Sequence, residues 1–200
     1  MTAIKPQKRP PSRRIQIKLA ALDCFLANGY VATTIADIRT RSGATTGSIY
    51  HFFENKGALA FELFSDALAD WSDETARAQT GSAPEDRLRA SIAGLLRWGI
   101  ASPNWFRFLD EVRALAQSHA ELAQCAQMLA NVHAEAAAWY DELARNGRVL
   151  ALPWSMAHAL MLGPAYDYLR TAAGGIDDAE AERAIVTLVD AAWKSVRVNA

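Results

Sequence analysis

The sequence lacks the features that define several classes of protein. No apolar run reaches the roughly 18 residues that a membrane-spanning helix needs, and the basic start MTAIKPQKRPPSRR is not followed by an apolar stretch of signal-peptide type. We therefore expect a cytoplasmic protein without a membrane partner. The alternation of apolar and polar residues that marks β-strands is also absent, whereas helical periodicity recurs, which predicts an all-α fold.

Residues suited to catalysis or metal binding are few and scattered. The two cysteines, Cys24 and Cys125, fall in apolar helical patterns, which favours reduced, buried thiols over a disulfide. His119, His133 and His158 fall on separate predicted helices, without the i, i+4 spacing of a helical metal site. No nucleophile motif or phosphate-binding glycine loop is present. We predict no catalytic residue, metal or cofactor, with an enzyme that processes a ligand among the helices as an alternative.

Positive charge is concentrated at the start of the chain. The 200 residues are 51% apolar and carry a net charge of −1, but residues 1–56 hold nine Lys or Arg against three acidic residues, and the remainder holds twelve against nineteen. Clustered basic side chains neutralise phosphates, so this division predicts that the N-terminal part meets a nucleic acid. The charge alone leaves open a merely solvated basic tail.

Capping residues and a glycine turn predict two short helices after a first helix over residues 12–28. Thr34 and Asp37 have the spacing of a capping box, which starts the second helix. Gly43 can adopt the positive φ of a tight interhelix turn, and Thr45 can cap the third helix. The first helix is predicted to be half-buried through one apolar stripe, formed by Ile15, Leu19, Leu22 and Leu26.

The third helix is predicted to have one buried and one polar face. A step of about 100° per residue puts Ile49 and Phe53 together as the buried anchor. The opposite face is small or polar and comprises Gly47, Ser48, Tyr50 and His51. Small and hydroxyl-bearing residues let a helix approach base edges and phosphates closely, so this face is predicted to enter the DNA major groove. The alternative is a polar surface helix without function.

Residues 13–60 resemble the DNA-binding domain of the tetracycline-repressor (TetR) family of transcriptional regulators. The resemblance rests on ALDCFLANGYVATTIADI, SGATTGSIYHFFENKGAL and their spacing, and it covers about a quarter of the chain. It implies phosphate contacts by Thr34, Thr45, Tyr50 and Lys56. It also implies groove-facing positions for Thr46, Gly47, Ser48 and His51.

Six further helices are predicted in the rest of the chain. Ser102 is predicted to cap one of them, Gly163 and Pro164 to kink another, and Asp177 to begin the last with Glu180 as its capping partner. The fourth, fifth and sixth helices are predicted over about 55–79, 84–100 and 103–117. The seventh is predicted to end at Asn146, the eighth to span about 153–173, and the ninth to begin at 177. The chain thus has about nine helices.

We predict a basic flexible arm over 1–11, a helix-turn-helix domain over 12–56 and a helical effector-binding and dimerisation domain over 57–200. The TetR resemblance implies a homodimer through the eighth and ninth helices, although a buried monomeric core would carry the same apolar stripe. The predicted function is a repressor that binds a palindromic double-stranded DNA operator and is released by a small molecule. A non-specific architectural DNA-binding protein is the alternative.

Aromatic residues of the helical domain suit a pocket for an apolar or aromatic effector, with histidines to orient it. Ordinary core packing would use the same residue types. The candidates are Trp98, Trp105, Phe108, His133, Trp139, His158, Met161 and Tyr166.

Overall fold

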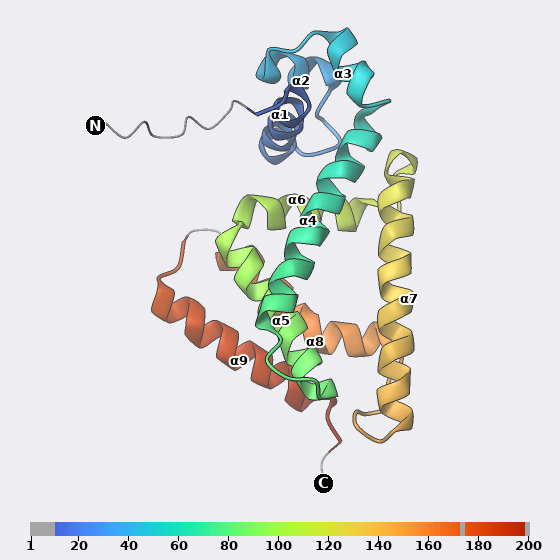
Figure 1. Cartoon of the computed structure of the whole chain (residues 1–200), viewed down its shortest axis with the longest axis vertical. Coiled ribbons are helices and arrows are strands. Elements are labelled where there is room, and N and C mark those ends of the chain that lie inside the picture. The colour runs from blue at the N-terminus through green and yellow to red at the C-terminus, as the bar shows by residue number, and fades with distance from the viewer. Residues whose placement is uncertain (1–10, 173–174, 199–200) are drawn as a thin grey trace, which may run out of the picture. The chain divides into compact units, whose positions relative to one another are not determined.

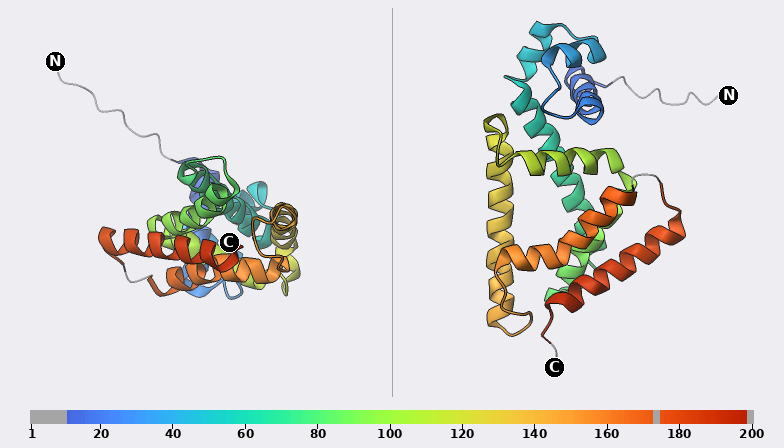
Figure 2. Two further views of the ribbon diagram at one scale, coloured as in Figure 1. Left: turned by 90° about the horizontal axis from the view of Figure 1, so that it is seen from below. Right: turned by 180° about the vertical axis from the view of Figure 1, so that it is seen from behind.

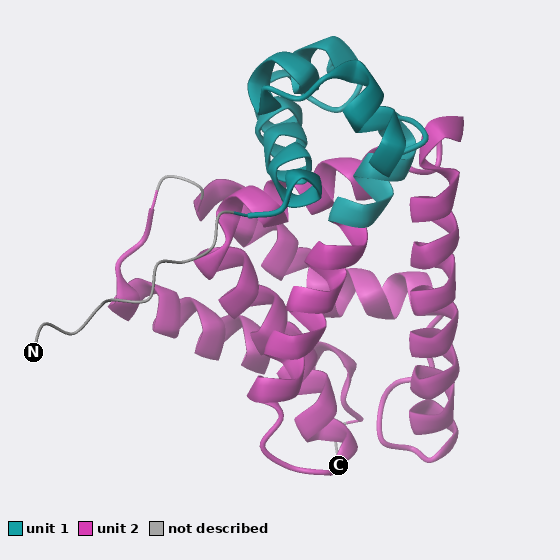
Figure 3. Cartoon of the chain, turned by 45° about the horizontal axis from the view of Figure 1, so that its top comes forward, with its two compact units in different colours: residues 1–63 teal, residues 64–200 magenta. Residues whose placement is uncertain are grey.

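A computed structural model describes residues 11–172 and 175–198, and it divides into two compact units (Figure 3). Unit 1 comprises Met1–Leu63 and unit 2 comprises Phe64–Ala200. The predicted all-α class is confirmed, since the described ranges contain nine α-helices and one short 3-10 helix. None of these helices combines the length and apolarity needed to cross a membrane. The predicted arm over 1–11 lies, apart from Pro11, outside the described residues.

Unit 1 contains α1 (Arg13–Asn28), α2 (Ile35–Ser42), α3 (Thr46–Phe52) and the first part of α4 (Lys56–Ala78) (Figure 1). α2 packs against α1 and contacts α3. The predicted local signals are confirmed: Thr34 and Asp37 form a complete capping box, and Thr45 caps α3. Gly43 ends α2 with φ 60°, in the left-handed region that a side chain disfavours.

The predicted buried stripe of α1 is partly wrong. Ile15 and Leu19 are each 47% exposed, whereas the helix buries a neighbouring stripe through Ile17, Ala20, Ala21, Leu22, Cys24 and Phe25. Both stripes fit the helical period, so periodicity did not decide between them. The small alanines of the observed face allow α2 to approach α1 closely, a packing partner that the sequence pattern does not reveal.

Unit 2 contains the second part of α4 and five further α-helices, with a 3-10 helix, η1 (Ala120–Leu122), before α7. The central α5 packs against α6, α8 and α9, and α7 contacts α6 and α8 (Figures 1 and 2). The core gathers on α5 and α6, whereas α7 buries few side chains. The bounds are α5 Pro84–Ala101, α6 Pro103–Leu115, α7 Ala123–Arg145, α8 Trp154–Thr171 and α9 Asp178–Val196.

In unit 2 the predicted cap at Asp177 is confirmed, whereas the predicted cap at Ser102 is wrong. Its side chain makes no capping bond, because the residue serves as the junction of two helices and its N–H donates to the Trp98 carbonyl of α5 (2.8 Å). Asp177 does cap α9, accepting from the N–H of Glu180 (2.7 Å). Pro164 lies inside α8, where it cannot donate a helical hydrogen bond, and the helix bends along its length (Figure 2).

Candidate functional site

The third helix of unit 1 has the two faces that its sequence predicts. Ile49 is fully buried and Phe53, which ends the helix, is 2% exposed. On the other side Tyr50 is 52% exposed, and Ser48 is half-buried. The remaining exposed residues of this polar face are Thr46, Gly47 and His51. The buried pair therefore anchors α3 while its polar face lies open to solvent.

Two of the predicted phosphate-contacting residues are helix caps. Thr34 accepts a hydrogen bond from the Asp37 N–H (3.2 Å), and its hydroxyl donates to the Asp37 carboxylate (2.7 Å). The Thr34 N–H also donates to this carboxylate (2.8 Å), and the bonds that the carboxylate accepts from the Thr34 hydroxyl and N–H hold the pKa of Asp37 below its usual value. The Thr45 hydroxyl accepts from the Ser48 N–H (3.1 Å). Both threonines are exposed, so their observed role is to start α2 and α3.

The third predicted phosphate contact, Lys56, is bound within unit 1. Its ammonium donates to the carbonyl oxygens of Tyr30 (3.0 Å), Thr33 (3.1 Å) and Val31 (3.4 Å). The same ammonium lies 4.4 Å from the centre of the Tyr30 ring, a cation–π distance. Thr33 is itself buried and donates to the carbonyl oxygens of Gly29 (2.8 Å) and Cys24 (3.1 Å). Lys56 thus ties the loop between α1 and α2 to the start of α4, a role that the sequence analysis missed.

Several other basic residues of unit 1 have partners within it. Arg14 and Lys18 pair with Glu62, and Arg41 pairs with Asp23 (2.8 Å). These pairs remain partly exposed, so they neutralise local charge more than they stabilise the fold. The basic excess of residues 1–56 therefore depends heavily on the cations that precede α1, which are Lys5, Lys8 and Arg9.

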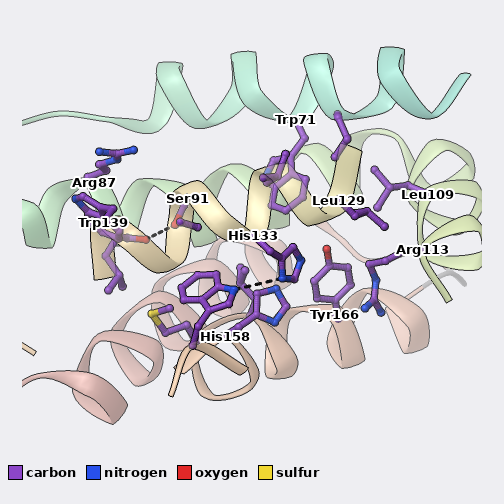
Figure 4. A pocket seen from close by; sticks show the side chains of 17 residues that line it. Trp71, Arg87, Ser91, Leu109, Arg113, Leu129, His133, Trp139, His158 and Tyr166 are labelled. Atoms are coloured by element: carbon purple, nitrogen blue, oxygen red, sulfur yellow. Dashed lines mark hydrogen bonds between the residues drawn. The ribbon is translucent and has the colours of Figure 1, made fainter. Parts of the chain in front are cut away.

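Unit 2 contains a cavity of about 200 Å³, enclosed by its part of α4 and by α5, α6, α7 and α8 (Figure 4). Its wall is mostly apolar and includes Leu68, Leu88, Leu109, Leu129, Val132, Ala136 and Leu162. Five of the eight predicted effector-binding residues lie in this wall, namely His133, Trp139, His158, Met161 and Tyr166. The wall also includes residues that the sequence analysis missed, of which Trp71, Arg87, Ser91, Arg113 and Trp154 bear polar atoms.

The other three predicted residues do not line the cavity. Trp98 and Phe108 are buried in the core. Trp98 stacks on Trp71, with ring centres 6.4 Å apart, and so supports the wall from behind. Trp105 is half-buried and lies one turn before Leu109, the first residue of α6 in the cavity wall. Aromatic content alone did not separate the residues that line a space from those that fill the core.

Two histidines from different helices meet at the cavity. His133 of α7 and His158 of α8 have ring centres 4.9 Å apart, and the indole N–H of Trp154 donates to Nδ1 of His133 (3.2 Å). Burial lowers the pKa of His133, with Arg113 adding to the effect. Burial, aided by His133 and Arg113, lowers the pKa of His158 to about 4. Both imidazoles are therefore neutral at neutral pH.

Comparison with known proteins agrees with the geometry of unit 1. The family described as bacterial regulatory proteins, tetR family, matches residues 17–63, the stretch that holds the two caps, the glycine turn and the exposed face of α3. This match to the tetR-family model covers about a quarter of the chain. Two similar curated proteins are the HTH-type transcriptional repressor KstR2 of Mycolicibacterium smegmatis, 38% identical over 32% of this chain and 30% of that protein, and the HTH-type transcriptional regulator TtgR of Pseudomonas putida, 40% identical over 38% and 35%.

These curated tetR-family relatives are matched over only about a third of their length. Solved structures extend the likeness in fold to unit 2. A TetR family transcription regulator from Marinobacter aquaeolei VT8 has a TM-score of 0.71 at 20% identity, covering 94% of this chain and 96% of that one. The fatty acid degradation regulator FadR from Bacillus halodurans has a TM-score of 0.67 at 19% identity, covering 91% and 97%. At such identities the likeness establishes the fold.

The position of Lys56 leads to a test of its role. We expect Lys56→Met, which keeps the stem length, to speed amide hydrogen exchange in the loop between α1 and α2 by roughly 10- to 100-fold. This corresponds to the loss of about 1.5–3 kcal/mol from hydrogen bonds to a charged group. Hydrogen-exchange mass spectrometry measures it, with Arg39→Met as a matched exposed control on α2. Unchanged exchange in the loop would contradict the observed role.

The resemblance to TetR regulators implies that Lys56 also contacts a phosphate, and the same variant tests this separately. Loss of one phosphate contact lowers the slope of the logarithm of the DNA-binding constant against the logarithm of salt concentration by about 1. An unchanged slope together with faster loop exchange would leave Lys56 with a positioning role only.

The lowered pKa of His158 predicts that unit 2 loses stability in acid. Between about pH 6.5 and the folded pKa of about 4, the unfolded state binds the proton and the folded state does not. The titration of this histidine therefore leaves the free energy of unfolding unchanged above about pH 6.5. The free energy of unfolding falls as the pH drops below that value, by roughly 1–2 kcal/mol after allowance for solvent screening. All six tryptophans belong to unit 2, so urea unfolding followed by tryptophan fluorescence reports on this unit.

The control for this pH dependence is a pair of histidine variants. His158→Gln should lose less stability than the parent protein between about pH 7 and about pH 5, because the buried titrating group is gone. His51→Gln, on the exposed face of α3, should keep the parent's dependence. Equal slopes for His158→Gln and the parent would show that other groups cause the acid sensitivity.

Proposed function

We propose that this chain is a DNA-binding transcriptional repressor that binds a palindromic operator as a homodimer and is released by a small molecule. The observation that carries the proposal is the coincidence of the tetR-family match over residues 17–63 with an α3 whose polar face is exposed above a buried anchor. Thr46, Gly47, Ser48 and His51 are proposed to face the bases. Thr34, Thr45, Tyr50 and Lys56 are proposed to contact phosphates. Repression is supported by the similar protein KstR2, which is a transcriptional repressor by name.

The proposed homodimer uses α8 and α9. Met156 and Leu160 on α8 are 52% and 40% exposed, and Val186 on α9 is 60% exposed. Large apolar side chains left open on adjacent packed helices favour association with another protein surface, and a twofold symmetric dimer would match a palindrome. In such a dimer the recognition helices would suit half-sites about 34–36 Å apart, or a multiple of that spacing. Sedimentation of the parent protein and of a Val186→Glu variant tests the interface.

The cavity of unit 2 is proposed as the effector site. Its apolar wall and few polar groups are typical of small-molecule sites, and release follows if the effector prefers a conformation with a different spacing of the two α3 helices. DNase footprinting on fragments of the source genome tests the whole proposal. A protected palindrome supports a sequence-specific regulator, whereas protection without sequence preference would indicate an architectural DNA-binding protein.

A further inference from the structure

The chemistry of the cavity wall defines the class of molecule that the cavity accepts. Four large aromatic side chains from three helices line it: Trp71 of α4, Trp139 of α7, and Trp154 and Tyr166 of α8 (Figure 4). Flat rings favour stacked or edge-on contacts with another aromatic ring. The size of the space, about 200 Å³, suits a compact ring system better than a long flexible chain. An aromatic ring therefore suits the apolar part of this wall.

A hydrogen-bond donor in this wall has no partner. The indole Nε1 of Trp71 is buried and makes no hydrogen bond in the structure, and an indole nitrogen can only donate. A buried donor without an acceptor is costly, so such a group marks a position where a bound molecule is expected to supply one. The hydroxyl of Tyr166 points into the same space (Figure 4). Because Nδ1 of His133 accepts from Trp154, the proton of its neutral ring is on Nε2, which makes this nitrogen a third donor.

The charges of the wall are of one sign. Arg87 and Arg113 line the cavity, and no Asp or Glu is among its lining residues. Arg87 lies over the Trp139 ring, with its guanidinium carbon 4.7 Å from the ring centre. Arg113 is bound to Asp110 (2.8 Å), outside the wall. A cationic ligand would have to leave water for a largely apolar space that offers it two guanidinium groups and no carboxylate, which is unfavourable.

We propose that the cavity binds an aromatic compound that carries a hydrogen-bond acceptor, such as a carbonyl oxygen, and no positive charge, with the Trp71 indole N–H and the Tyr166 hydroxyl as donors to that acceptor. This inference rests on the proposed function in one respect, which is that the bound compound acts as the effector. The cavity's selectivity itself does not depend on DNA binding.

The test uses three probes with one ring system and substituents at the same ring position: acetylnaphthalene, ethylnaphthalene and naphthylmethylammonium. Isothermal titration calorimetry of the full chain should give the tightest binding for acetylnaphthalene. Ethylnaphthalene should bind roughly 5- to 10-fold more weakly because it leaves the donors unpaired, and the ammonium compound should bind weakest. Equal affinity for acetylnaphthalene and ethylnaphthalene, or preference for the ammonium compound, overturns the inference.

Three variants show whether the named donors cause the selectivity. Tyr166→Phe removes only a hydroxyl and Trp71→Phe removes the indole N–H, and each should reduce the preference for acetylnaphthalene over ethylnaphthalene by roughly threefold or more. Trp98→Phe is the matched control, because Trp98 also has a buried indole nitrogen without a partner but does not line the cavity. If all three variants keep the parent's preference, the assigned donors are wrong.

Operator release separates this inference from the proposed function. If acetylnaphthalene binds with the expected selectivity and a footprinted operator is not released, the cavity chemistry holds and the effector role fails. If no operator is found, the calorimetric comparison still supports or overturns the inference on the cavity.

Discussion

We expect Gly47→Glu to weaken operator binding by roughly 100-fold or more, because placing like charges together at an interface costs several kcal/mol. Gly47 is exposed in the first turn of α3, and a carboxylate on the proposed DNA-facing side would meet the phosphates and base edges of the operator. The structure has room for a side chain at this position. A Cβ atom built at Gly47 meets nothing within 4 Å.

The fold of this variant should be retained. Glutamate is a better helix former than glycine, and a negative charge in the first turn of a helix is favourable. The thermal midpoint should therefore be unchanged or slightly raised, which circular dichroism measures beside a gel-shift titration. Ala134→Glu adds the same charge at an exposed position of α7 and controls for net charge. An unfolded Gly47→Glu protein, or one that binds the operator normally, would contradict the proposed orientation of α3.

Features set by neighbouring residues could be predicted from the sequence. The capping box of Thr34 and Asp37, the cap at Thr45 and the left-handed Gly43 are all confirmed, because each depends on residues within one helical turn. The buried pair of Ile49 and Phe53 is also confirmed. It required only the helical period and the presence of large apolar residues at the right spacing.

Contacts between distant residues could not be predicted in the same way. Lys56 binds carbonyl groups 23 to 26 residues earlier in the chain, and a backbone carbonyl leaves no mark in the sequence. The wrong prediction of the buried stripe of α1 has a related cause. The predicted stripe, with Ile15 and Leu19, has the helical period, and so does the stripe that is buried in the structure. The packing partner decides which stripe is covered, and a single helix does not reveal its partner.

The residues that line the cavity of unit 2 also come together through contacts that the sequence does not predict. The sequence predicts His133 and His158 on separate helices, which is confirmed, but the 4.9 Å distance between their ring centres follows from the packing of α8 beside α7. Trp71 fits an apolar stripe of α4 and looks like a core residue, yet it lines the cavity with its N–H unpaired. Residue type predicted an aromatic site, whereas the tertiary packing determines which aromatic residues surround an open space.

Filling the cavity should block the proposed effector while sparing DNA binding. Ala136 lines the cavity from α7, so the ring of an Ala136→Phe variant would occupy part of its 200 Å³. We expect the affinity for acetylnaphthalene to fall by roughly 10- to 100-fold, the factor that corresponds to about 1–3 kcal/mol of overpacking once the probe must share the space. Calorimetry measures this loss directly.

The operator affinity of Ala136→Phe without the probe should equal that of the parent, because the residue belongs to unit 2 and is remote in sequence from the proposed DNA contacts. Addition of acetylnaphthalene should then no longer release the operator at the concentrations that release it from the parent protein. Ala138→Phe adds the same ring at an exposed position of α7, outside the cavity lining, and should behave as the parent in both assays. If Ala136→Phe binds the probe normally, the probe does not occupy this cavity, and the proposed effector site must lie elsewhere in the chain.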